Sequence, residues 1–214
     1  MRVDSVNAGR AELMKIGART ISTGIRKAPV ERGYVGLLGL AGDVVADTMN
    51  HGGVDQAIYV YSSEDYAWWG EELAAVPAPG TFGENLTLSS FGPEPVQIGD
   101  RYRVGAALLE VTAPRIPCAT FATRMGESNW VKRFAEARRP GLYVRVLEAG
   151  EVAVGDPVDR IDGEDDCPTV VDLMDVWYDV EPDPRLLERL LASPLAERAR
   201  PNVERMLSRA LAGR

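Results

Sequence analysis

The sequence contains few of the residues on which metal sites, disulfide frameworks and Schiff-base enzymes depend. There is one histidine, His51, and there are two cysteines, Cys118 and Cys167, in unlike surroundings far apart along the chain. This set offers neither a zinc-ligand spacing nor a disulfide framework. Lysine is also scarce, and the three present are Lys15, Lys27 and Lys132. We therefore expect neither a zinc protein, nor a disulfide-rich secreted domain, nor a pyridoxal-phosphate enzyme.

Long apolar runs and phosphate-binding loops are absent as well. No run of about 18 apolar residues predicts a membrane span, and residues 1–6 lack the apolar core of a signal peptide. The chain has no P-loop, no dinucleotide-binding fingerprint and no Gly-x-Ser-x-Gly nucleophile turn. Its formal net charge of −8 argues against a general nucleic-acid binder. We expect a cytoplasmic protein without membrane or nucleic-acid partners.

The charges that are present are divided between two regions. Residues 101–145 contain nine basic and three acidic side chains, whereas residues 148–183 contain thirteen acidic side chains and a single basic one, Arg160. Cys118 lies in the basic region. A local positive field suits an anionic ligand such as a phosphate, but a solvated basic face has the same pattern. The charge distribution alone leaves both interpretations open.

The first 162 residues are dominated by short β-type segments. Strands are predicted over 1–9, 34–40, 44–47, 57–61, 81–88, 103–113, 142–147, 152–154 and 158–161, with a hairpin turn at 105–106. Helices are predicted over 62–73, directly after Cys118, and over 129–138, whereas residues 10–19 and 22–30 are predicted to be irregular. The first helix has Ser62 or Ser63 as its cap. Repeated short strands with Gly-Asp turns favour a barrel or sandwich over a βαβ arrangement.

The acidic residues 163–168 are typical of a linker, and the chain after them has a helical pattern. Thr169 can cap a helix over 170–178, while Asp183-Pro184 and Ser193-Pro194 each place a capping side chain before a proline that starts a helix. Helices this short are not stable alone, so they must pack on one another, on the β domain or on a second subunit. We predict a β domain over 1–162 and a three-helix domain over 169–214, and a homodimer remains open.

The segment Pro114-Arg115-Ile116-Pro117-Cys118 is the strongest candidate for chemistry. The two prolines fix the backbone, and a helical pattern starts after the cysteine, so the thiol is expected on a stiff loop at a helix N-terminus. A nearby cation and a helix N-terminus both favour the thiolate. Cys118 could be a nucleophile, a ligand to a soft metal or a buried structural cysteine. The residue types also allow a nucleophilic pair of Cys118 and His51.

Two further segments carry polar residues next to glycine. His51-Gly52-Gly53 places the single histidine beside amides that a ligand could approach closely, and Asp55 could orient the imidazole. Glu84-Asn85 follows Phe82-Gly83 where a strand is predicted. A structural histidine and ordinary turn chemistry are the simpler interpretations of these two segments.

Taken in order, these motifs resemble the MOSC-domain family, and its YiiM type in particular. The resemblance spans residues 20–160. The motifs that carry it are Thr23-Gly24-Ile25 with Lys27 and Pro29-Val30, Gly39-Leu40 with Gly42-Asp43, His51-Gly52-Gly53 with Asp55 and Ala57, Phe82-Gly83-Glu84-Asn85-Leu86, Ile98-Gly99-Asp100, and Pro114-Arg115 with Pro117-Cys118. The helical tail is also similar to the three-helix domain that follows the MOSC domain in YiiM-type proteins.

The resemblance implies a mainly β fold, with a MOSC-type β-barrel, short peripheral helices and a small C-terminal helical domain, that binds the molybdenum cofactor. Cys118 would be the molybdenum ligand, a role that suits a soft thiolate, and Cys118 and His51 would lie at the reaction centre. The residues that would hold the pterin and its phosphate are Lys27, His51, Gly52, Gly53 and Arg115. Further groups facing the pterin or supporting its ligands would be Asp55, Glu84 and Asn85.

The resemblance also implies a function. YiiM-type proteins are associated with reduction of N-hydroxylated purines, so a molybdenum-dependent oxidoreductase acting on a small N-hydroxylated substrate is expected. The chain has no motif for a flavin or iron–sulfur centre, so a separate protein would supply electrons. One alternative is a cofactor carrier or sulfur-handling protein without reductase turnover, and a second is a Cys118–His51 thiol hydrolase or transferase. Thr48-Met49-Asn50 lacks the lysine and additional histidine expected in YiiM-type relatives, which leaves the substrate preference open.

Overall fold

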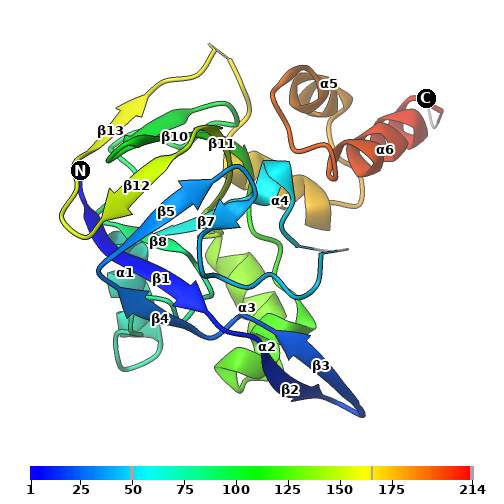
Figure 1. Ribbon diagram of the computed structural model, residues 1–214. Helices are drawn as coiled ribbons and strands as arrows, with labels where there is room; N and C mark the ends of the chain where they lie inside the picture. The colour runs from blue at the N-terminus through cyan, green and yellow to red at the C-terminus, as the bar shows by residue number, and fades with distance from the viewer. Residues whose placement is uncertain (49–50, 165, 213–214) are drawn as a thin grey trace.

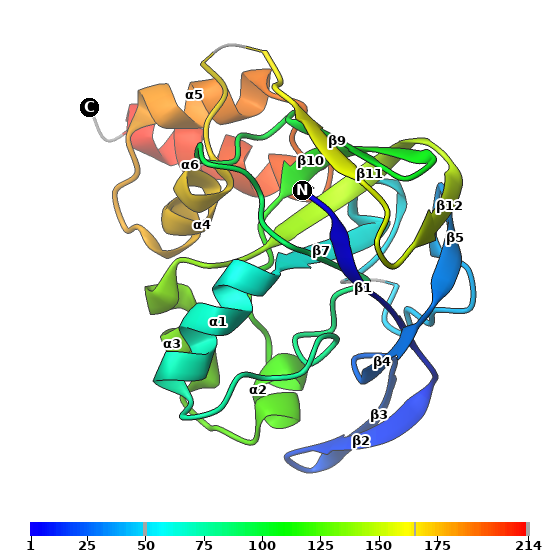
Figure 2. The same ribbon diagram turned by 90° about the vertical axis from the view of Figure 1, so that its left-hand side faces the viewer.

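The strands form the centre of the molecule, and the helices lie in two groups around them. The computed structural model describes residues 1–48, 51–164 and 166–212. Figure 1 shows the C-terminal helices at one end of the sheet, and Figure 2 shows α1, α2 and α3 together on another side. None of the described helices is long and apolar enough to cross a membrane.

The main sheet has eight strands in the order β13-β9-β10-β11-β7-β8-β1-β4. Its neighbouring pairs are antiparallel except for β7 and β8, which run parallel. The strands of this sheet are β1 (Val3–Gly9), β4 (Lys27–Val30), β7 (Ile58–Ser62), β8 (Leu86–Leu88), β9 (Arg101–Val104), β10 (Ala107–Ala113), β11 (Leu142–Glu148) and β13 (Val158–Ile161). A three-stranded sheet consists of β12 (Gly150–Ala153), β5 (Arg32–Gly36) and β6 (Gly39–Leu40). A separate hairpin consists of β2 (Glu12–Ile16) and β3 (Arg19–Thr23).

The helices begin at the capping residues that the sequence predicts in most cases. Ser62 caps α1 by accepting a hydrogen bond from the Asp65 amide at 3.0 Å, and Thr169 forms a reciprocal capping box with Asp172 at the start of α4. Asp183 caps α5, with Pro184 as its first residue. The helices are α1 (Ser63–Glu72), α2 (Ala119–Met125), α3 (Trp130–Ala137), α4 (Val170–Tyr178), α5 (Pro184–Ala192) and α6 (Arg200–Ala212), with a 3₁₀ turn η1 (Val54–Gln56).

The predicted mainly β class is confirmed, but a closed barrel is not found among the described residues. The main sheet is mixed, and its outer strands β13 and β4 are not paired with each other. One end of the sheet is nevertheless drawn together, because Arg2 and Pro157 form an antiparallel bridge. Beside it the Val3 amide donates to the Asp156 carbonyl at 2.9 Å, and the Gly155 amide donates to the Val3 carbonyl at 2.8 Å. These bonds tie the start of β1 to the turn before β13.

Several local predictions are wrong. Residues 27–30, predicted to be irregular, form β4 because they pair with β1, and only 86–88 of the strand predicted over 81–88 forms a strand. Residues 12–23 form the β2–β3 hairpin instead of an irregular excursion, because Met14 is buried and Ile16 and Ile21 pack on an aromatic cluster. Residues 44–47 form no strand, since this segment lies directly against the backbone of Gly24. The last helix starts at Arg200 and not at residue 194. Leu195 and Ala196 are instead buried in the core as an irregular segment, held where the Ala196 amide donates to the Thr112 carbonyl at 3.1 Å.

The interior has an aliphatic part and an aromatic part. The aliphatic cluster consists of strand residues packed together with Leu187, Leu190 and Val203 of the C-terminal helices, so these helices share a core with the strands. The aromatic cluster lies under α1, α2 and α3 and includes Tyr59, Tyr61, Tyr66, Trp69, Phe82, Phe121, Trp130 and Phe134. The division at residues 162 and 168 stays a prediction, and Asp165 of the predicted linker lies outside the described residues.

Candidate functional site

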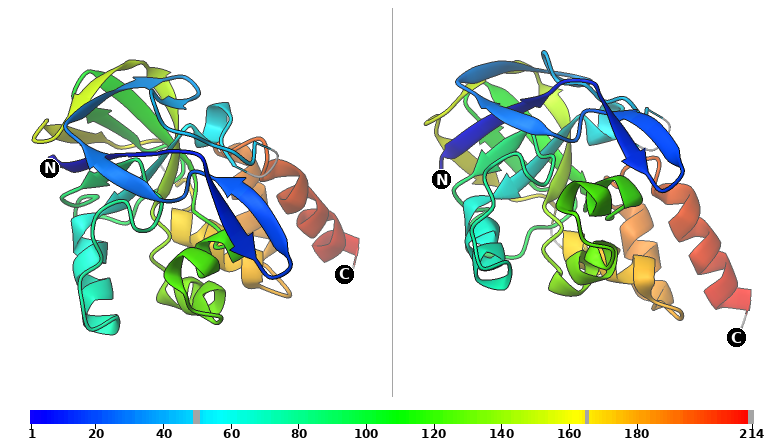
Figure 3. Two further views of the ribbon diagram at one scale, coloured as in Figure 1. Left: turned by 60° about the horizontal axis from the view of Figure 1, so that its bottom comes forward. Right: turned by 90° about the horizontal axis from the view of Figure 1, so that it is seen from below.

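An open cavity of about 670 Å³ lies between the aromatic cluster and the N-terminal strands. Its walls come from segments far apart in sequence: the β3–β4 connection, residues 44–47, the His51 turn, β7, the end of the 81–85 loop, and the loop that precedes α2. Figure 3 shows the β2–β3 hairpin extending beside α2, where its last residues form one wall. Six of the nine predicted site residues line the cavity: Lys27, His51, Gly52, Asn85, Arg115 and Cys118.

Cys118 is held at the start of α2, as the sequence predicts. It is the N-cap residue of this helix with an extended backbone, after four residues without helix or strand. The Ala122 amide donates to its carbonyl at 3.0 Å, so the helix fixes the position of the cysteine backbone. The side chain is half-buried and packs against the aromatic cluster, whose Phe121 lies one turn further along α2. The thiol is therefore both anchored and accessible from the cavity.

The surroundings of Cys118 favour its thiolate form. Burial alone would raise its pKa, but a hydrogen bond with His51, the charge of Arg115 and the Phe121 amide together lower the pKa from 9.0 to about 6. The other cysteine behaves in the opposite way, because burial and the nearby charges of Glu164 and Asp100 raise the pKa of Cys167. The two thiols therefore differ in ionisation, and Cys118 is the one whose surroundings favour the thiolate.

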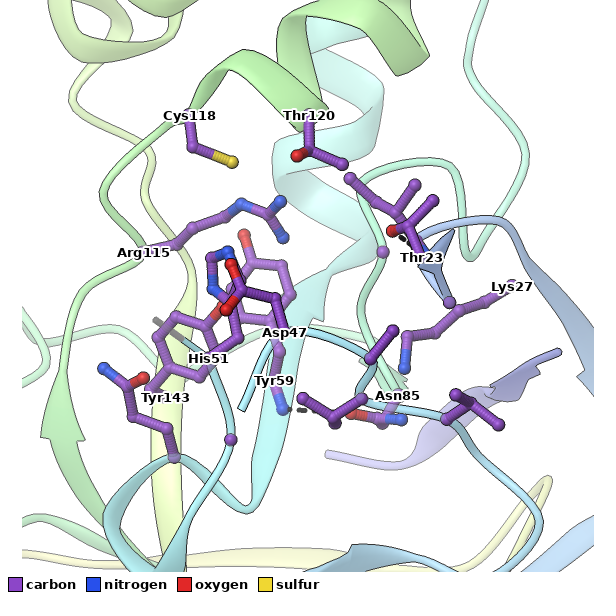
Figure 4. Close-up of a pocket in the computed structure, with 18 of the residues that line it drawn as sticks. Thr23, Lys27, Asp47, His51, Tyr59, Asn85, Arg115, Cys118, Thr120 and Tyr143 are labelled. Atoms are coloured by element: carbon purple, nitrogen blue, oxygen red, sulfur yellow. Dashed lines mark hydrogen bonds between the residues drawn. The ribbon is translucent and has the colours of Figure 1, made fainter. Parts of the chain in front are cut away.

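Arg115 is a buried cation on the floor of the cavity. It is 5% exposed, and its guanidinium carbon lies 4.9 Å from the centre of the Tyr59 ring and 4.2 Å from that of Phe121. One nitrogen donates to the Phe82 carbonyl at 2.7 Å, while the buried Nε atom has no hydrogen-bond partner. Among the described residues no carboxylate forms an ion pair with Arg115, but the nearby charges of Cys118 and Glu84 and the stacking on two rings favour its charged form. Figure 4 shows the guanidinium between Cys118 and Tyr59.

Lys27 lies at the opposite end of the cavity from Cys118 (Figure 4) and is paired with a buried acid. Its ammonium group forms an ion pair with Asp43, and both side chains are less than one tenth exposed. Burial lowers the pKa of Lys27, and the charge of Asp43 opposes this effect. The Asp43 carboxylate also accepts hydrogen bonds from the Gly9 amide at 2.7 Å and from the Asn85 side chain at 2.8 Å. This network fixes Lys27 and Asn85 in the wall.

The remaining three predicted site residues do not line this cavity. Asp55 forms an ion pair with Arg145 at 3.0 Å and accepts from the Glu197 amide at 2.8 Å, so it joins the sheet to the C-terminal segment. Glu84 is fully buried, and its Oε1 atom accepts from the Gly80 amide, the Tyr66 hydroxyl and the Thr87 hydroxyl. Gly53 begins the η1 turn. A direct part in ligand binding stays a prediction for these three residues.

The structure adds cavity residues for which the sequence offers little signal. Thr23, Tyr59, Thr120 and Tyr143 line the cavity, and the Tyr59 and Tyr143 rings lie 5.0 Å apart between centres. By pattern, Tyr59 of β7 and Tyr143 of β11 are ordinary core positions of strands, so only their place at the cavity identifies them as site residues. Asp43 could have been predicted as a site residue from the sequence, because it stands in the Gly42-Asp43 motif directly before the wall segment 44–47. Met49 and Asn50, where the sequence departs from its expected relatives, lie outside the described residues.

Known proteins of similar sequence and a family model match this chain. A family model described as the MOSC domain matches residues 47–159. Among proteins of similar sequence, the uncharacterized protein YflK of Bacillus subtilis is 37% identical over 71% of this chain and 69% of its own length, and protein YiiM of Escherichia coli is 30% identical over 73% and 70%. A protein named reductase from Gibberella moniliformis is 31% identical over 73% of this chain, which spans only 28% of that protein.

Solved structures have the same fold along nearly the whole chain. YiiM from Geobacillus stearothermophilus has a TM-score of 0.78 at 26% identity, with 96% of this chain and 98% of that chain covered. YiiM from Escherichia coli has a TM-score of 0.74 at 24% identity and covers 100% and 94%. The shared region includes the C-terminal helices as well as the sheet, so these helices are part of the common architecture.

Proposed function

Since this chain belongs to the MOSC-domain family and is of the YiiM type, we propose that it binds the molybdenum cofactor and reduces small N-hydroxylated compounds. The cofactor is a molybdopterin phosphate complex, and a relative named reductase supports a redox activity. Reduction of an N-hydroxyl group takes two electrons and two protons, breaks the N–O bond and releases the oxygen as water. A separate flavin or iron–sulfur protein would supply the electrons, because the sequence has no motif for either centre.

The observation that carries the proposal is the buried Arg115 guanidinium, which has an unpartnered donor and lies beside an acidic thiol. No carboxylate among the described residues forms an ion pair with Arg115, so its donors suit an anionic ligand in the cavity. Guanidinium groups bind phosphate oxygens through short charge-assisted hydrogen bonds. The unpartnered Nε atom of Arg115 is the kind of donor that such a ligand would satisfy.

The metal-binding capacity of the chain also fits a cofactor that brings most of its own ligands. No group of three or more His, Cys, Asp or Glu side chains that could hold a metal ion occurs within the described parts of the chain. A metal at this site would therefore have Cys118 as its single protein thiolate, and its other ligands would belong to the bound group. A soft, sulfur-ligated metal centre suits such a donor set. When bound, the cofactor supplies the two-electron redox chemistry.

The residues of the cavity would divide the remaining tasks. Cys118 would be the metal ligand, and His51, hydrogen-bonded to it, would keep the sulfur ionised and could hold a proton for the departing oxygen. Arg115 would bind an anionic group of the cofactor. Lys27 and Asn85, fixed by Asp43, would orient the pterin at the far end of the cavity. Apolar walls from the aromatic cluster would limit access of water.

The test is to measure molybdenum and released pterin in protein purified from a host that makes the cofactor. Cys118→Ser is expected to lose molybdenum while keeping a folded structure with cooperative thermal unfolding, and Cys167→Ser is the matched control that retains the metal. A Cys118→Ser protein with wild-type molybdenum content would contradict the assignment. The loaded wild type is then assayed with a hydroxylamino-purine and an artificial electron donor. Retained molybdenum without turnover would favour a cofactor carrier or sulfur-handling protein.

A thiol hydrolase or transferase is the second candidate, because His51 forms a hydrogen bond with the Cys118 sulfur. This candidate requires protein without bound molybdenum that a thiol reagent inactivates. Metal analysis therefore separates it from the proposed function. A homodimer and a cytoplasmic location stay predictions, and size-exclusion chromatography with light scattering tests the first of them.

A further inference from the structure

A second cleft, of about 1120 Å³ and open to solvent, adjoins Cys118. It shares Asp47, His51, Gln56, Cys118, Thr120 and Tyr143 with the first cavity. The shared residues place the thiol at the junction of the two spaces. A ligand in the second cleft would thus lie next to a cofactor bound in the first.

The wall of the second cleft combines the Cys118 loop with the C-terminal helical segment. Ile116 and Pro117 line one side, and Leu173 and Trp177 of α4 line the other. Trp177 is half-buried, so part of its indole ring remains open to the cleft, and Tyr143 provides a second ring. Apolar and aromatic walls of this kind bind flat ring systems.

One cation from the C-terminal segment also faces this cleft. Arg198 donates to the Gln56 side-chain oxygen at 3.2 Å and to the Thr48 carbonyl at 3.3 Å. Neither partner carries a charge, and both bonds are at the long end of the normal range. Asp47 lines the same cleft, so the charges around it are mixed. A guanidinium held by two neutral oxygens remains a donor for an anionic substituent of a ligand.

We propose that the second cleft is the substrate site, and that Trp177 and Arg198 make it select flat N-hydroxylated aromatic compounds that carry a carboxylate or another anionic group. This inference rests on the proposed function for the N-hydroxyl group, but the selection of a flat anion follows from the cleft alone. The ring lies between Trp177 and the Ile116–Pro117 wall, the anionic group reaches Arg198, and the N–O bond points to the junction with the first cavity, where the cofactor would be bound. The C-terminal helices thereby act as the specificity element of the protein.

Two pairs of small molecules test this selection. 4-Hydroxylaminobenzoate and phenylhydroxylamine differ only in the carboxylate, and their reduction products, 4-aminobenzoate and aniline, contain no N–O bond. We expect 4-aminobenzoate to bind to molybdenum-free protein in calorimetry at least about tenfold more tightly than aniline, the size expected of one partly exposed charge-assisted bond. With loaded protein, kcat/KM should be higher for 4-hydroxylaminobenzoate by a similar factor.

The variants separate the charge from the ring contact. Arg198→Gln should lower kcat/KM for 4-hydroxylaminobenzoate about tenfold and leave that for phenylhydroxylamine within about twofold. Arg185→Gln is the matched control, since Arg185 is an exposed arginine of α5 that lines neither cleft. Trp177→Ala should weaken binding of both products, and Trp177→Phe should restore most of it because a ring is retained. Melting temperatures identify any variant whose fold has changed.

The outcomes distinguish this inference from the proposed function. If the loaded protein reduces neither hydroxylamine but 4-aminobenzoate still binds in an Arg198-dependent manner, the reductase function is wrong and the anion-selective cleft stands. If both hydroxylamines are reduced equally and Arg198→Gln changes neither value, the function stands and the inference is overturned. Equal binding of 4-aminobenzoate and aniline to the molybdenum-free protein would overturn it as well.

Discussion

The acidity of the Cys118 thiol can be tested without any cofactor. A pKa of about 6 means that about nine-tenths of Cys118 is thiolate at pH 7, compared with about one hundredth for a pKa of 9.0. The measurement is the rate of alkylation by iodoacetamide between pH 4 and 10 in molybdenum-free protein, with each cysteine followed by peptide mass spectrometry. Cys118 should show a midpoint near pH 6, whereas the midpoint of Cys167 should lie above its ordinary value because its pKa is raised.

The midpoint is a better measure than the absolute rate. A thiolate becomes less nucleophilic as its pKa falls, by about 15- to 30-fold for the change from 9.0 to about 6. At pH 7 this loss offsets most of the gain in thiolate, so the two cysteines could react at similar rates. Only the pH dependence separates ionisation from intrinsic reactivity.

Removing the imidazole should move the Cys118 midpoint upward. A hydrogen bond to a charged group contributes about 1.5–3 kcal/mol, which corresponds to about 1 to 2 pH units. His51→Ala is therefore expected to react with a midpoint between about pH 7 and 8. Ser22→Ala, which changes another cavity residue, is the control and should keep the wild-type midpoint. A wild-type midpoint of 8 or more would refute the reasoning, and an unchanged midpoint in His51→Ala would show that the imidazole does not act on the sulfur.

Four further predictions follow from the contacts. Asp43→Asn leaves the Lys27 ammonium buried without its partner, so urea unfolding should show a loss of about 3–5 kcal/mol, and Lys27→Met combined with Asp43→Leu should lose less. Phe121→Ala should cost about 3–5 kcal/mol in the same assay and loosen Arg115, seen as weaker pterin retention. Asp55→Ala should lower stability by about 1–3 kcal/mol but leave molybdenum content unchanged, because Asp55 contacts Arg145 and the Glu197 amide and not the cavity. Because folding lowers the pKa of Cys118, the thiolate should contribute fully to the free energy of unfolding above the pKa of the unfolded state, and this contribution should disappear as the pH falls through about 6. The difference in free energy of unfolding between wild type and Cys118→Ser, from urea unfolding at pH 5.5, 7 and 9, measures this contribution.

The sequence predicted those parts of the fold that local chemistry determines. Ser62, Thr169 and Asp183 cap helices where predicted, because a capping side chain bonds amides within its own turn. The Gly105 turn joins β9 and β10 as predicted, because glycine readily adopts the positive φ of 52° that this turn requires. Strand pairing and irregular wall segments depend on distant partners instead. Residues 44–47 have a strand-like composition, yet they lie against Gly24 and form no ladder.

The same distinction explains the site. Cys118, Arg115 and His51 stand in motifs whose residue types suggest chemistry, and the structure brings them to one cavity. Asp55 and Glu84 stand in equally good motifs but have structural partners, which spacing cannot reveal. Tyr59 and Tyr143 line the cavity, although by pattern they are ordinary strand residues. A motif therefore identifies residues worth examining, while burial and partners decide their role.

The helical tail shows the limit of local inference most clearly. From its sequence, Leu187 and Leu190 identify an apolar face that must be covered, but the pattern does not say by what. The structure covers it with the sheet, and this packing brings Trp177 and Arg198 to the edge of the Cys118 loop. If the tail had packed on a second subunit instead, the thiol would have lacked its second cleft. The position of the tail, and with it the selectivity proposed for the site, thus depends on core packing against strands distant in sequence and on bonds such as that from the Ala196 amide to the Thr112 carbonyl.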